Sequence, residues 1–398
     1  VYWMATEDHD FDEINYFNFK DKKIAWNRDD GGAVGQFSTK GLKEVFEQFS
    51  EQLGATRNAD FLRELFSKGY LQHSTLTEAT RYIANQLFAK YGLVVIDGDD
   101  YQLKELFAPY IMQELEEQVS FNVVSETIRE LEKNYKIQVN PREINLFYLG
   151  ENFRERIVLE KGVYKVNNTE IVFSKEEILR EVKERPNRFS PNVIMRPLYQ
   201  EVILPNLAYI GGGGELAYWL QLKSYFKTVS IPFPILVLRN SVQVISSKQQ
   251  KKLDNLQIST KELFLKLNEL LAVKVKENSS IEIDFSKQKA YLSSQFSQLK
   301  KVAKKTDESF VGAVNAQEKK QLNGLDKLEK RLLIAEKRRQ VDLVTRITEI
   351  KNQLFPNQSL EERQRNFSEF YLEYGDRFIE ALKAELKPLE LEFTILEL

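Results

Sequence analysis

One short acidic segment combines side chains that proton transfer requires. Glu7, Asp8, His9 and Asp10 follow one another directly after an apolar run. Carboxylates beside an imidazole set its orientation and basicity, so His9 can act as an acid or a base tuned by Asp8 and Asp10. The same carboxylates could instead hold a hard cation such as Mg²⁺, or simply begin a helix, where negative charge is favourable. We predict a catalytic role for Asp8, His9 and Asp10, with no resident metal.

A run of four glycines is the second candidate site. Gly211, Gly212, Gly213 and Gly214 lie between a predicted strand and a predicted helix. Backbone amides without side chains can approach an anion at the positive end of a helix. The run matches neither the Walker lysine pattern nor strict G-x-G-x-x-G spacing, so it indicates anion binding without a standard nucleotide motif. Glu215, the next residue, could bind an amine or a hydroxyl group.

Arginine, amide and aromatic side chains stand near other predicted strands. Guanidinium and amide groups donate the hydrogen bonds that carboxylates and phosphates accept. Five further residues are therefore predicted to contact a substrate or a nucleotide: Arg196, Tyr199, Arg239, Asn240 and Asn145.

Three more arginines surround an aromatic run. Arg142 precedes the run, and Arg154 and Arg156 follow it. Such arginines can clamp a carboxylate or a phosphate through paired hydrogen bonds, or they can make structural ion pairs with Glu143 or Glu155. The sequence leaves both interpretations open.

Two other polar segments have simpler interpretations. The turn at residues 97–100, Asp-Gly-Asp-Asp, could meet a metal or a ligand, although Asp-Gly is also common turn chemistry. His73 precedes a predicted helix, and we expect it in a loop or a helix cap.

These residues need a scaffold that brings distant segments together, and the apolar pattern predicts one. From residue 1 to about residue 258, short apolar runs alternate with amphipathic helices, as in an α/β domain. Ligands of such domains collect beyond the carboxyl ends of the strands. Buried strands are predicted at Val1–Ala5, Leu93–Ile96, Leu207–Ile210 and Ile235–Leu238.

Other elements are predicted from the same pattern. Apolar faces indicate helices over residues 42–53, 76–91 and 103–131. Residues of about 135–200 are expected to insert into the parallel sheet, with a hairpin at 163–173 whose turn contains Asn167 and Asn168.

The pattern of apolar residues changes after residue 259. Apolar residues at intervals of three and four over 285–354 predict a coiled-coil arm or an antiparallel hairpin across 259–356. A break is expected within 307–315 and a weak point at Asn323-Gly324, and Pro356 should end the arm. Residues 357–398 are expected to form a helix and a terminal strand that returns to the α/β body.

Composition narrows the functional classes. The 398 residues carry a formal net charge of −2 and no cysteine, so nothing in the balance favours nucleic acid, and disulfides and thiolate metal sites are excluded. No apolar run approaches the roughly 20 residues that span a bilayer. We expect a soluble cytoplasmic protein without membrane or nucleic-acid partners. The apolar start at Val1 also suggests that further sequence lies upstream.

Several strings, in their order along the whole chain, resemble the cysteine-adding enzymes of bacillithiol synthesis, the cysteine ligase family. The strings are Tyr2-Trp3, residues 7–11, Asn145-Leu146-Phe147, residues 196–200, the glycine run with residues 215–219, and Arg239-Asn240-Ser241. The resemblance implies a Rossmann-like core with connecting-peptide insertions, and a helical coiled coil that supports a homodimer. Such proteins also look longer at the amino end, where a first strand and a Gly-Gln-Gln-like loop would sit.

The resemblance also implies an activity. The carboxyl group of cysteine would form an amide with the amino group of malyl-glucosamine, in the last step of bacillithiol synthesis. ATP or another nucleotide, with Mg²⁺, could activate the carboxyl group. Two alternatives remain: a nucleotide-dependent transferase of the nucleotidylyl-transferase type acting on another small substrate, and a non-catalytic coiled-coil scaffold.

Overall fold

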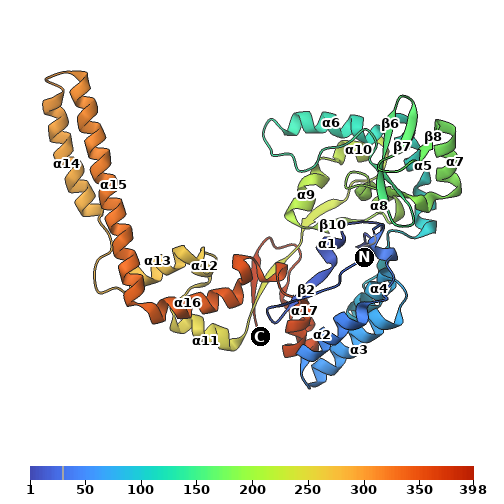
Figure 1. Cartoon of the computed structure of the whole chain (residues 1–398), viewed down its shortest axis with the longest axis horizontal. Helices are drawn as coiled ribbons and strands as arrows, with labels where there is room; N and C mark the ends of the chain where they lie inside the picture. The colour runs from blue at the N-terminus through green and yellow to red at the C-terminus, as the bar shows by residue number, and fades with distance from the viewer. Residues whose placement is uncertain (29–30) are drawn as a thin grey trace. The chain divides into compact units, whose positions relative to one another are not determined.

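The computed structural model of the chain describes residues 1–28 and 31–398, which form two compact units (Figure 1). Unit 1 comprises Val1–Ser241 and Arg365–Thr394, and unit 2 comprises Val242–Gln364 and Ile395–Leu398. The first is an α/β unit and the second is almost entirely helical, as predicted.

Parallel strands are present in unit 1 at all four predicted places, but they are not buried as predicted: they form two sheets of two strands each, and at most one residue of each strand is buried. β1 (Tyr2–Met4) pairs in parallel with β4 (Val95–Asp97), and β10 (Ala208–Gly211) pairs in parallel with β11 (Ile235–Leu238). Parallel pairing requires a long crossover between the two strands. Residues that follow β1 and β4 therefore meet at one sheet edge, although about ninety residues of helices separate them in the sequence.

Twelve helices of unit 1 surround these strands in the described part of the chain. They are α1 (Phe11–Ile14), α2 (Leu42–Leu53), α3 (Arg57–Gln72), α4 (Leu76–Phe88), α5 (Tyr101–Glu117), α6 (Val119–Leu131), α7 (Lys175–Glu184), α8 (Arg196–Ile203), α9 (Gly213–Leu220), α10 (Lys223–Thr228), α17 (Phe367–Tyr374) and α18 (Asp376–Glu385). The helix predicted over 103–131 is two helices instead of one. Gln118 breaks it with φ of 53°, and the Glu114 carboxylate accepts bonds from the amide and hydroxyl of Ser120 at the start of α6.

An antiparallel sheet of five strands lies within the stretch predicted as an insertion. Its strand order is β8-β7-β6-β5-β9, and the predicted hairpin at 163–173 is present as β7 and β8. The strands are β5 (Leu146–Leu149), β6 (Arg154–Glu160), β7 (Val163–Val166), β8 (Val172–Phe173) and β9 (Phe189–Pro191). A separate hairpin pairs β2 (Tyr16–Phe19) with β3 (Lys22–Ala25).

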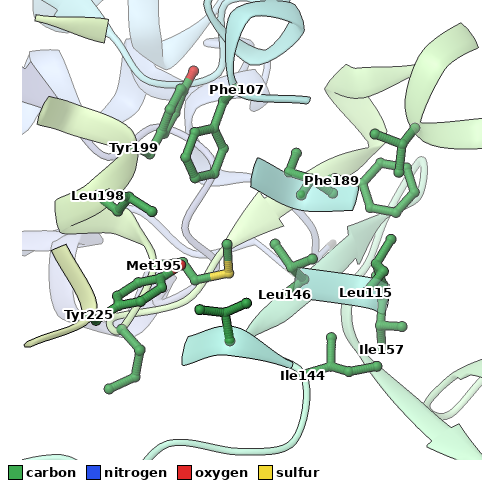
Figure 2. Close-up of a cluster of buried hydrophobic side chains, with 14 of the residues drawn as sticks. Phe107, Leu115, Ile144, Leu146, Ile157, Phe189, Met195, Leu198, Tyr199 and Tyr225 are labelled. Carbon is green, nitrogen blue, oxygen red and sulfur yellow. The ribbon is translucent and has the colours of Figure 1, made fainter. Parts of the chain in front are cut away.

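The largest core of unit 1 joins this sheet to α5 and α8 (Figure 2). Phe107, Leu146, Met195 and Tyr199 are almost fully buried in it. The ring of Tyr199 meets that of Trp3 edge-on at 5.0 Å, and its hydroxyl donates to the Gly98 carbonyl at 3.1 Å. Tyr199, predicted to contact a ligand, is thus a core residue without exposed surface.

Unit 2 contains the long helices. They are α11 (Ser247–Asn255), α12 (Thr260–Leu263), α13 (Leu267–Glu277), α14 (Ser286–Ala303), α15 (Glu308–Arg339) and α16 (Val341–Leu354). α14 and α15 form an antiparallel hairpin (Figure 1). The break predicted within 307–315 is misplaced, because the chain turns before Asp307, which caps α15 by accepting a bond from the Phe310 amide at 3.1 Å. Asn323 and Gly324 lie inside α15 without interrupting it.

The predicted terminal strand is β13 (Phe393–Glu397), but it does not return to the α/β body as expected: it pairs with β12 (Ser241–Ile245), and most residues of both strands belong to unit 2. The remaining elements are 3-10 turns at Val34–Gln36, Ala89–Tyr91, Pro186–Arg188, Pro356–Gln358 and Glu361–Arg363. No helix in the described part of the chain has the length and apolar character needed to cross a membrane.

Candidate active site

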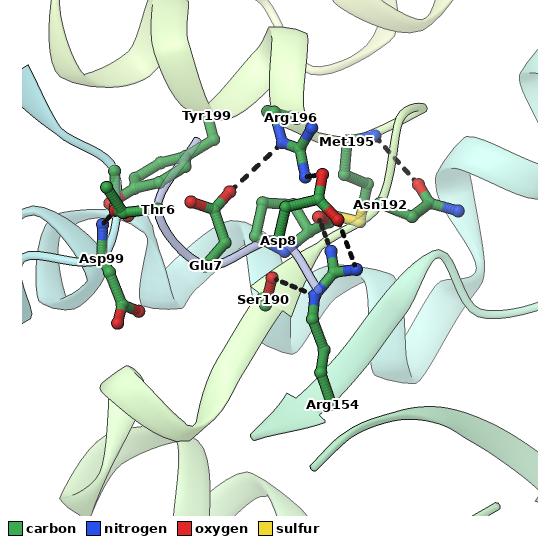
Figure 3. Close-up of polar contacts among 12 residues, drawn as sticks. Thr6, Glu7, Asp8, Asp99, Arg154, Ser190, Asn192, Met195, Arg196 and Tyr199 are labelled. Carbon is green, nitrogen blue, oxygen red and sulfur yellow. Dashed lines mark hydrogen bonds and ion pairs between the residues drawn. The ribbon is translucent and has the colours of Figure 1, made fainter. Parts of the chain in front are cut away.

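Asp8 stands between two arginines that come from distant elements (Figure 3). Arg196, the first residue of α8, donates from Nη2 to Asp8 Oδ2 at 2.8 Å and from Nε to Glu7 Oε1 at 3.2 Å. Arg154, the first residue of β6, donates from Nη1 to Asp8 Oδ1 at 3.3 Å. The carboxylate that follows β1 is therefore held from both sides.

Asp8, Arg154 and Arg196 stabilise one another in their charged forms. Burial opposes ionisation of Asp8, but the guanidinium groups of Arg196 and Arg154 outweigh it and hold the pKa of Asp8 below 3.8. Burial also lowers the pKa of Arg154 to about 10, so Arg154 still carries its charge at neutral pH. Asp8 is thus an ionised acceptor at physiological pH.

Arg154 is fixed by more than its ion pair. Its Nε donates to Ser190 Oγ at 3.1 Å, its Nη2 donates to the Pro191 carbonyl at 3.1 Å, and its guanidinium lies 3.9 Å from the Phe147 ring centroid. With only 6% of Arg154 exposed, its position is determined by the sheet rather than by solvent.

This arrangement selects one form of His9. Nη1 of Arg154 lies 2.8 Å from Nδ1 of His9, and a guanidinium can only donate, so Nδ1 must accept. The neutral imidazole then carries its proton on Nε2. His9, predicted to assist proton transfer, is in this geometry a hydrogen-bond donor through Nε2–H, since Nδ1 is occupied by the bond from Arg154.

The group opens onto a cavity of about 330 Å³, within the size range of small-molecule sites. Predicted catalytic and arginine-cluster residues meet here. The lining residues are Asp8, His9, Asp10, Val139, Asn140, Arg142, Ile144, Leu146, Phe147, Arg154, Arg156, Asn192, Val193 and Arg196.

A second cavity of about 410 Å³ shares Asp8 and Asp10 with the first. Its wall also contains Glu13 and the threonines Thr6, Thr77 and Thr80. The first cavity is rich in arginine, whereas the second has carboxylates and hydroxyls. The segment after β1 thus separates a cationic hollow from an acidic one.

Asn145 supports the first cavity from behind. Its side chain is fully buried, and Glu114 Oε1 accepts bonds from its Nδ2 at 3.3 Å and from its amide at 3.2 Å. Asn145 Oδ1 accepts from Asn192 Nδ2 at 2.8 Å and from the Arg142 amide at 3.1 Å. The predicted ligand contact is therefore a structural link between α5 and residues that line the cavity.

The glycine run occupies a strand-to-helix junction, as predicted. A carboxylate of the protein already occupies the beginning of α9, because Glu215 Oε2 accepts a bond from the Gly212 amide at 2.6 Å. A side chain at Gly213 would meet open space. Gly211, Gly212, Gly213 and Glu215 are not among the residues that line the first cavity.

Arg239 and Asn240 lie on the glycine side of the unit. The Arg239 amide donates to the Gly211 carbonyl at 2.9 Å, and its side chain lies beside Gly212. Asn240 Nδ2 donates to the Lys387 carbonyl at 3.0 Å. Of the residues predicted to share one cavity, the structure brings His9 and Arg196 together, and it does not place Gly212 or Asn240 in the same lining.

The two simpler predictions also have defined positions. Asp100 caps α5 by accepting from the Gln102 amide at 2.9 Å, and Asp99 pairs with buried Lys104, so the acidic turn serves the fold. His73 ends α3, and its Nδ1 lies 2.9 Å from the Lys68 carbonyl.

Asp8, His9 and Asp10 could geometrically approach one metal ion, since a ligand atom from each lies within 4.8 Å of the others. Their chemistry does not fit a cation. Both oxygens of Asp8 already accept bonds from guanidinium groups, and Nδ1 of His9 accepts from Arg154. An ion here would face two fixed positive charges.

Sequence reasoning assigned no role to three supporting residues. Glu7 is fully buried against Arg196, Ser190 holds Arg154, and Asn192 fixes the turn before α8 by accepting from the Ile194 amide at 2.8 Å. Glu7 carried the one usable signal, because it belongs to the acidic segment after a predicted strand, and a carboxylate that becomes buried must have a partner.

The chain matches two family models that together cover almost all of it. Residues 1–240 match "Bacillithiol biosynthesis BshC, N-terminal Rossmann-like domain", and residues 242–398 match "Bacillithiol biosynthesis BshC, C-terminal coiled-coil domain".

Curated relatives agree with these models. A protein of Christiangramia forsetii is 57% identical over all of this chain and 74% of its own length. Proteins of Flavobacterium johnsoniae and Flavobacterium psychrophilum are 56% and 57% identical, each over all of this chain and 75% of their own length. All three carry the name "Putative cysteine ligase BshC".

Proposed function

Because this chain belongs to the bacillithiol biosynthesis BshC family, we propose that it is a cysteine ligase acting in the last step of bacillithiol synthesis. The carboxyl group of cysteine would form an amide with the amino group of malyl-glucosamine. One observation carries the proposal on the structural side: the segment after β1 presents Asp8 and Asp10 to two cavities at once, and His9 to the first of them.

Two adjoining cavities suit a reaction that joins two molecules. The arginine-rich cavity matches an anionic group, and the acidic cavity matches the ammonium group of an amino acid or an amino sugar. Holding both reactants beside one segment converts a bimolecular encounter into a step within a single complex.

We assign the proton chemistry to two residues of that segment. The amine nitrogen attacks the activated carbonyl carbon, the C–N bond forms, the activating group leaves, and the nitrogen loses a proton. We propose that His9 donates a hydrogen bond from Nε2–H to the oxygen that gains negative charge, because its Nδ1 is already bonded to Arg154. Asp10 is exposed and lines both cavities, so its carboxylate is the proposed acceptor of the proton.

Amide formation at neutral pH requires an activated carboxyl group. We propose ATP or another nucleotide, with Mg²⁺, as the co-substrate that supplies this activation, as an adenylate or an acyl phosphate. The glycine run and Arg239 are the proposed contacts for its anionic groups, because the space beside Gly213 is open and the guanidinium of Arg239 is exposed next to Gly212.

We also propose a cytoplasmic homodimer joined through the α14–α15 hairpin. The absence of cysteine suits a reducing compartment. The hairpin exposes apolar side chains, among them Tyr291 and Leu328, that a second copy would cover.

The assay is direct. The full chain is incubated with cysteine, malyl-glucosamine, ATP and Mg²⁺, and products are identified by mass spectrometry. We expect the condensed thiol product, which should disappear when any one of cysteine, malyl-glucosamine or ATP is omitted. Asp10→Asn should lower kcat by about 100-fold through loss of the proton acceptor, with Asp12→Asn as the matched exposed control. Product formation that does not depend on malyl-glucosamine would favour a transferase acting on another substrate.

A further inference from the structure

The four arginines of the first cavity fall into two pairs with different surroundings. Arg154 and Arg196 are bound to carboxylates of the protein. Arg142 and Arg156 line the same cavity and make no ion pair with any residue in 1–28 or 31–398, including Glu143 and Glu155. We propose that Arg142 and Arg156 bind a carboxylate of the acceptor and make the site selective for an acidic acceptor. This inference rests on the proposed function and names its acceptor site.

The position of Arg156 follows from strand geometry. Side chains of residues two apart in a strand project from the same face, so Arg156 shares a face of β6 with Arg154. Its register partner on β5 is Phe147, another residue of the cavity wall. Arg154 reaches Asp8 from this face, and Arg156 is left with its donors toward the cavity.

Arg142 projects from a backbone that is held in place. The Asn145 side chain accepts a bond from the Arg142 amide at 3.1 Å and donates one to the Arg142 carbonyl at 2.8 Å. Glu114 and Ser120 hold Asn145 in turn, with Ser120 Oγ 2.6 Å from Asn145 Nδ2. Asn145 is therefore a positioning residue, and Arg142 is the group that would meet the ligand.

The charge of the wall favours an anion. Four guanidinium groups face Asp8 and Asp10, and positive charge remains in excess even when buried Glu7 is counted. An uncharged ligand would leave that excess without a partner in a partly enclosed space, whereas a carboxylate can accept paired hydrogen bonds from a guanidinium.

A carboxylate fits this wall better than a phosphate. Phosphate sites commonly use the free amides at the beginning of a helix. At the beginning of α8, the helix that borders the cavity, the Arg196 amide already donates to the Asn192 carbonyl at 2.8 Å and Pro197 has no amide hydrogen. Just before the helix, the amides of Ile194 and Met195 donate to Asn192 Oδ1 at 2.8 and 3.3 Å. The donors left for a ligand are then mainly planar guanidinium groups, which suit a planar carboxylate.

The test measures binding apart from turnover. L-malate is titrated calorimetrically into the full chain, into Arg142→Gln and Arg156→Gln, and into Arg129→Gln, an exposed arginine outside the cavity. We expect each cavity variant to weaken malate binding by about tenfold or more, as for loss of a charge-assisted hydrogen bond, while the control binds normally. The same variants should raise KM for malyl-glucosamine by a similar factor and leave kcat nearly unchanged.

Different outcomes bear on different claims. Unchanged malate binding and unchanged KM in both variants would overturn the inference while leaving the ligase proposal intact. Inorganic phosphate binding more tightly than malate, with the same dependence on Arg142 and Arg156, would also overturn it. If malate binding depends on both arginines but the wild-type chain forms no product, the carboxylate site stands and the ligase proposal fails.

Discussion

At the scale of single residues, the site depends on which atoms are already engaged. Asp8 and Nδ1 of His9 are both held by Arg154, and Asp8 is also held by Arg196. Fewer reactions are therefore open to Asp8 and His9 than their residue types alone suggest. Asp10 is the carboxylate of this segment that remains available for reaction.

Two substitutions of His9 separate donation from acceptance. Glutamine can place an amide donor near the position of Nε2, and asparagine can place an acceptor near the position of Nδ1. If His9 acts through Nε2–H, His9→Gln should keep much of the wild-type kcat, and His9→Asn should lose about 100-fold. Equal loss in both variants, measured by steady-state product formation, would instead indicate that His9 accepts a proton.

Removing the charge of Asp8 should destabilise unit 1. Asp8→Asn leaves the buried Arg154 guanidinium without its carboxylate, which should lower the free energy of unfolding by about 3 kcal/mol at pH 7. Urea unfolding followed by circular dichroism measures this loss, with exposed Asp12→Asn as the control. No loss beyond that of the control would mean that the ion pairs contribute little.

The same variant has a defined pH dependence. The pKa of Asp8 is lower in the folded state than its ordinary value of 3.8. Its contribution to stability is therefore complete above about pH 5 and is lost as the pH falls through the lower folded-state pKa. The stability gap between wild type and Asp8→Asn should stay constant in neutral solution and shrink in acid, and a gap that widens in acid would contradict this.

At the scale of elements, the supporting contacts join segments that the chain keeps far apart. Asn145 connects α5 to the loop of Arg142 and, through Asn192, to the start of α8. β6 contributes two arginines to one wall because of its two-residue repeat. The antiparallel insertion is thus part of the site and not a decoration of the parallel strands.

In unit 2, the buried side chain of Lys351 in α16 destabilises the folded state at neutral pH. This lysine is 3% exposed, donates to the Leu263 carbonyl and lies 3.4 Å from the ring centroid of Phe355. Burial lowers its pKa from 10.5 to about 8. In neutral solution, the folded state therefore carries an ammonium group that would be better solvated in the unfolded chain.

Lys351→Met should consequently stabilise unit 2 at pH 7 by about 1–2 kcal/mol, after allowance for the carbonyl left without its donor. The folded state releases the proton near pH 8 and the unfolded chain near 10.5, so wild-type stability rises across that interval and the advantage of methionine shrinks. Denaturant unfolding at pH 7 and at about pH 10 measures both effects, with exposed Lys330→Met as the control. An advantage that grows with pH would exclude this explanation.

At the scale of the whole molecule, the division of the chain agrees with the division of its family at one boundary and differs from it near the C-terminus. The two compact units change at residues 241 and 242, and the two family models end and begin at residues 240 and 242. Residues 365–394 belong to unit 1 although they follow the arm in the sequence. The arm is therefore inserted in the sequence between two segments of unit 1.

Substitutions on the α14–α15 hairpin test the proposed homodimer. A hollow of about 760 Å³ on α14 and α15 is lined by Tyr291, Leu292, Leu325 and Leu328 with lysines and an arginine beside them. Tyr291 and Leu328 are 69% and 52% exposed, so Tyr291→Glu with Leu328→Glu should keep the hairpin folded and abolish pairing of two copies. Light scattering should report a dimer for the wild type and for Gln317→Glu, and a monomer for the double variant. A wild-type monomer would end the dimer proposal.

Much of the architecture could be predicted from the sequence because it depends on local patterns. Apolar runs placed β1, β4, β10 and β11, and intervals of three and four placed the long helices. The acidic segment, the glycine run and the arginines around Phe147 were also visible as residue types at strand ends. Local signals sufficed because burial periodicity and helix geometry act over a few residues.

Only the tertiary structure decided which of those residues meet. Arg154 could pair with adjacent Glu155 or with distant Asp8, and the sheet that carries it directs it to Asp8. Asn145 and Tyr199 look like ligand contacts in the sequence, but packing buries both of them. The physical reason is that ion pairing and burial depend on distances across the fold, which residue spacing along the chain does not specify.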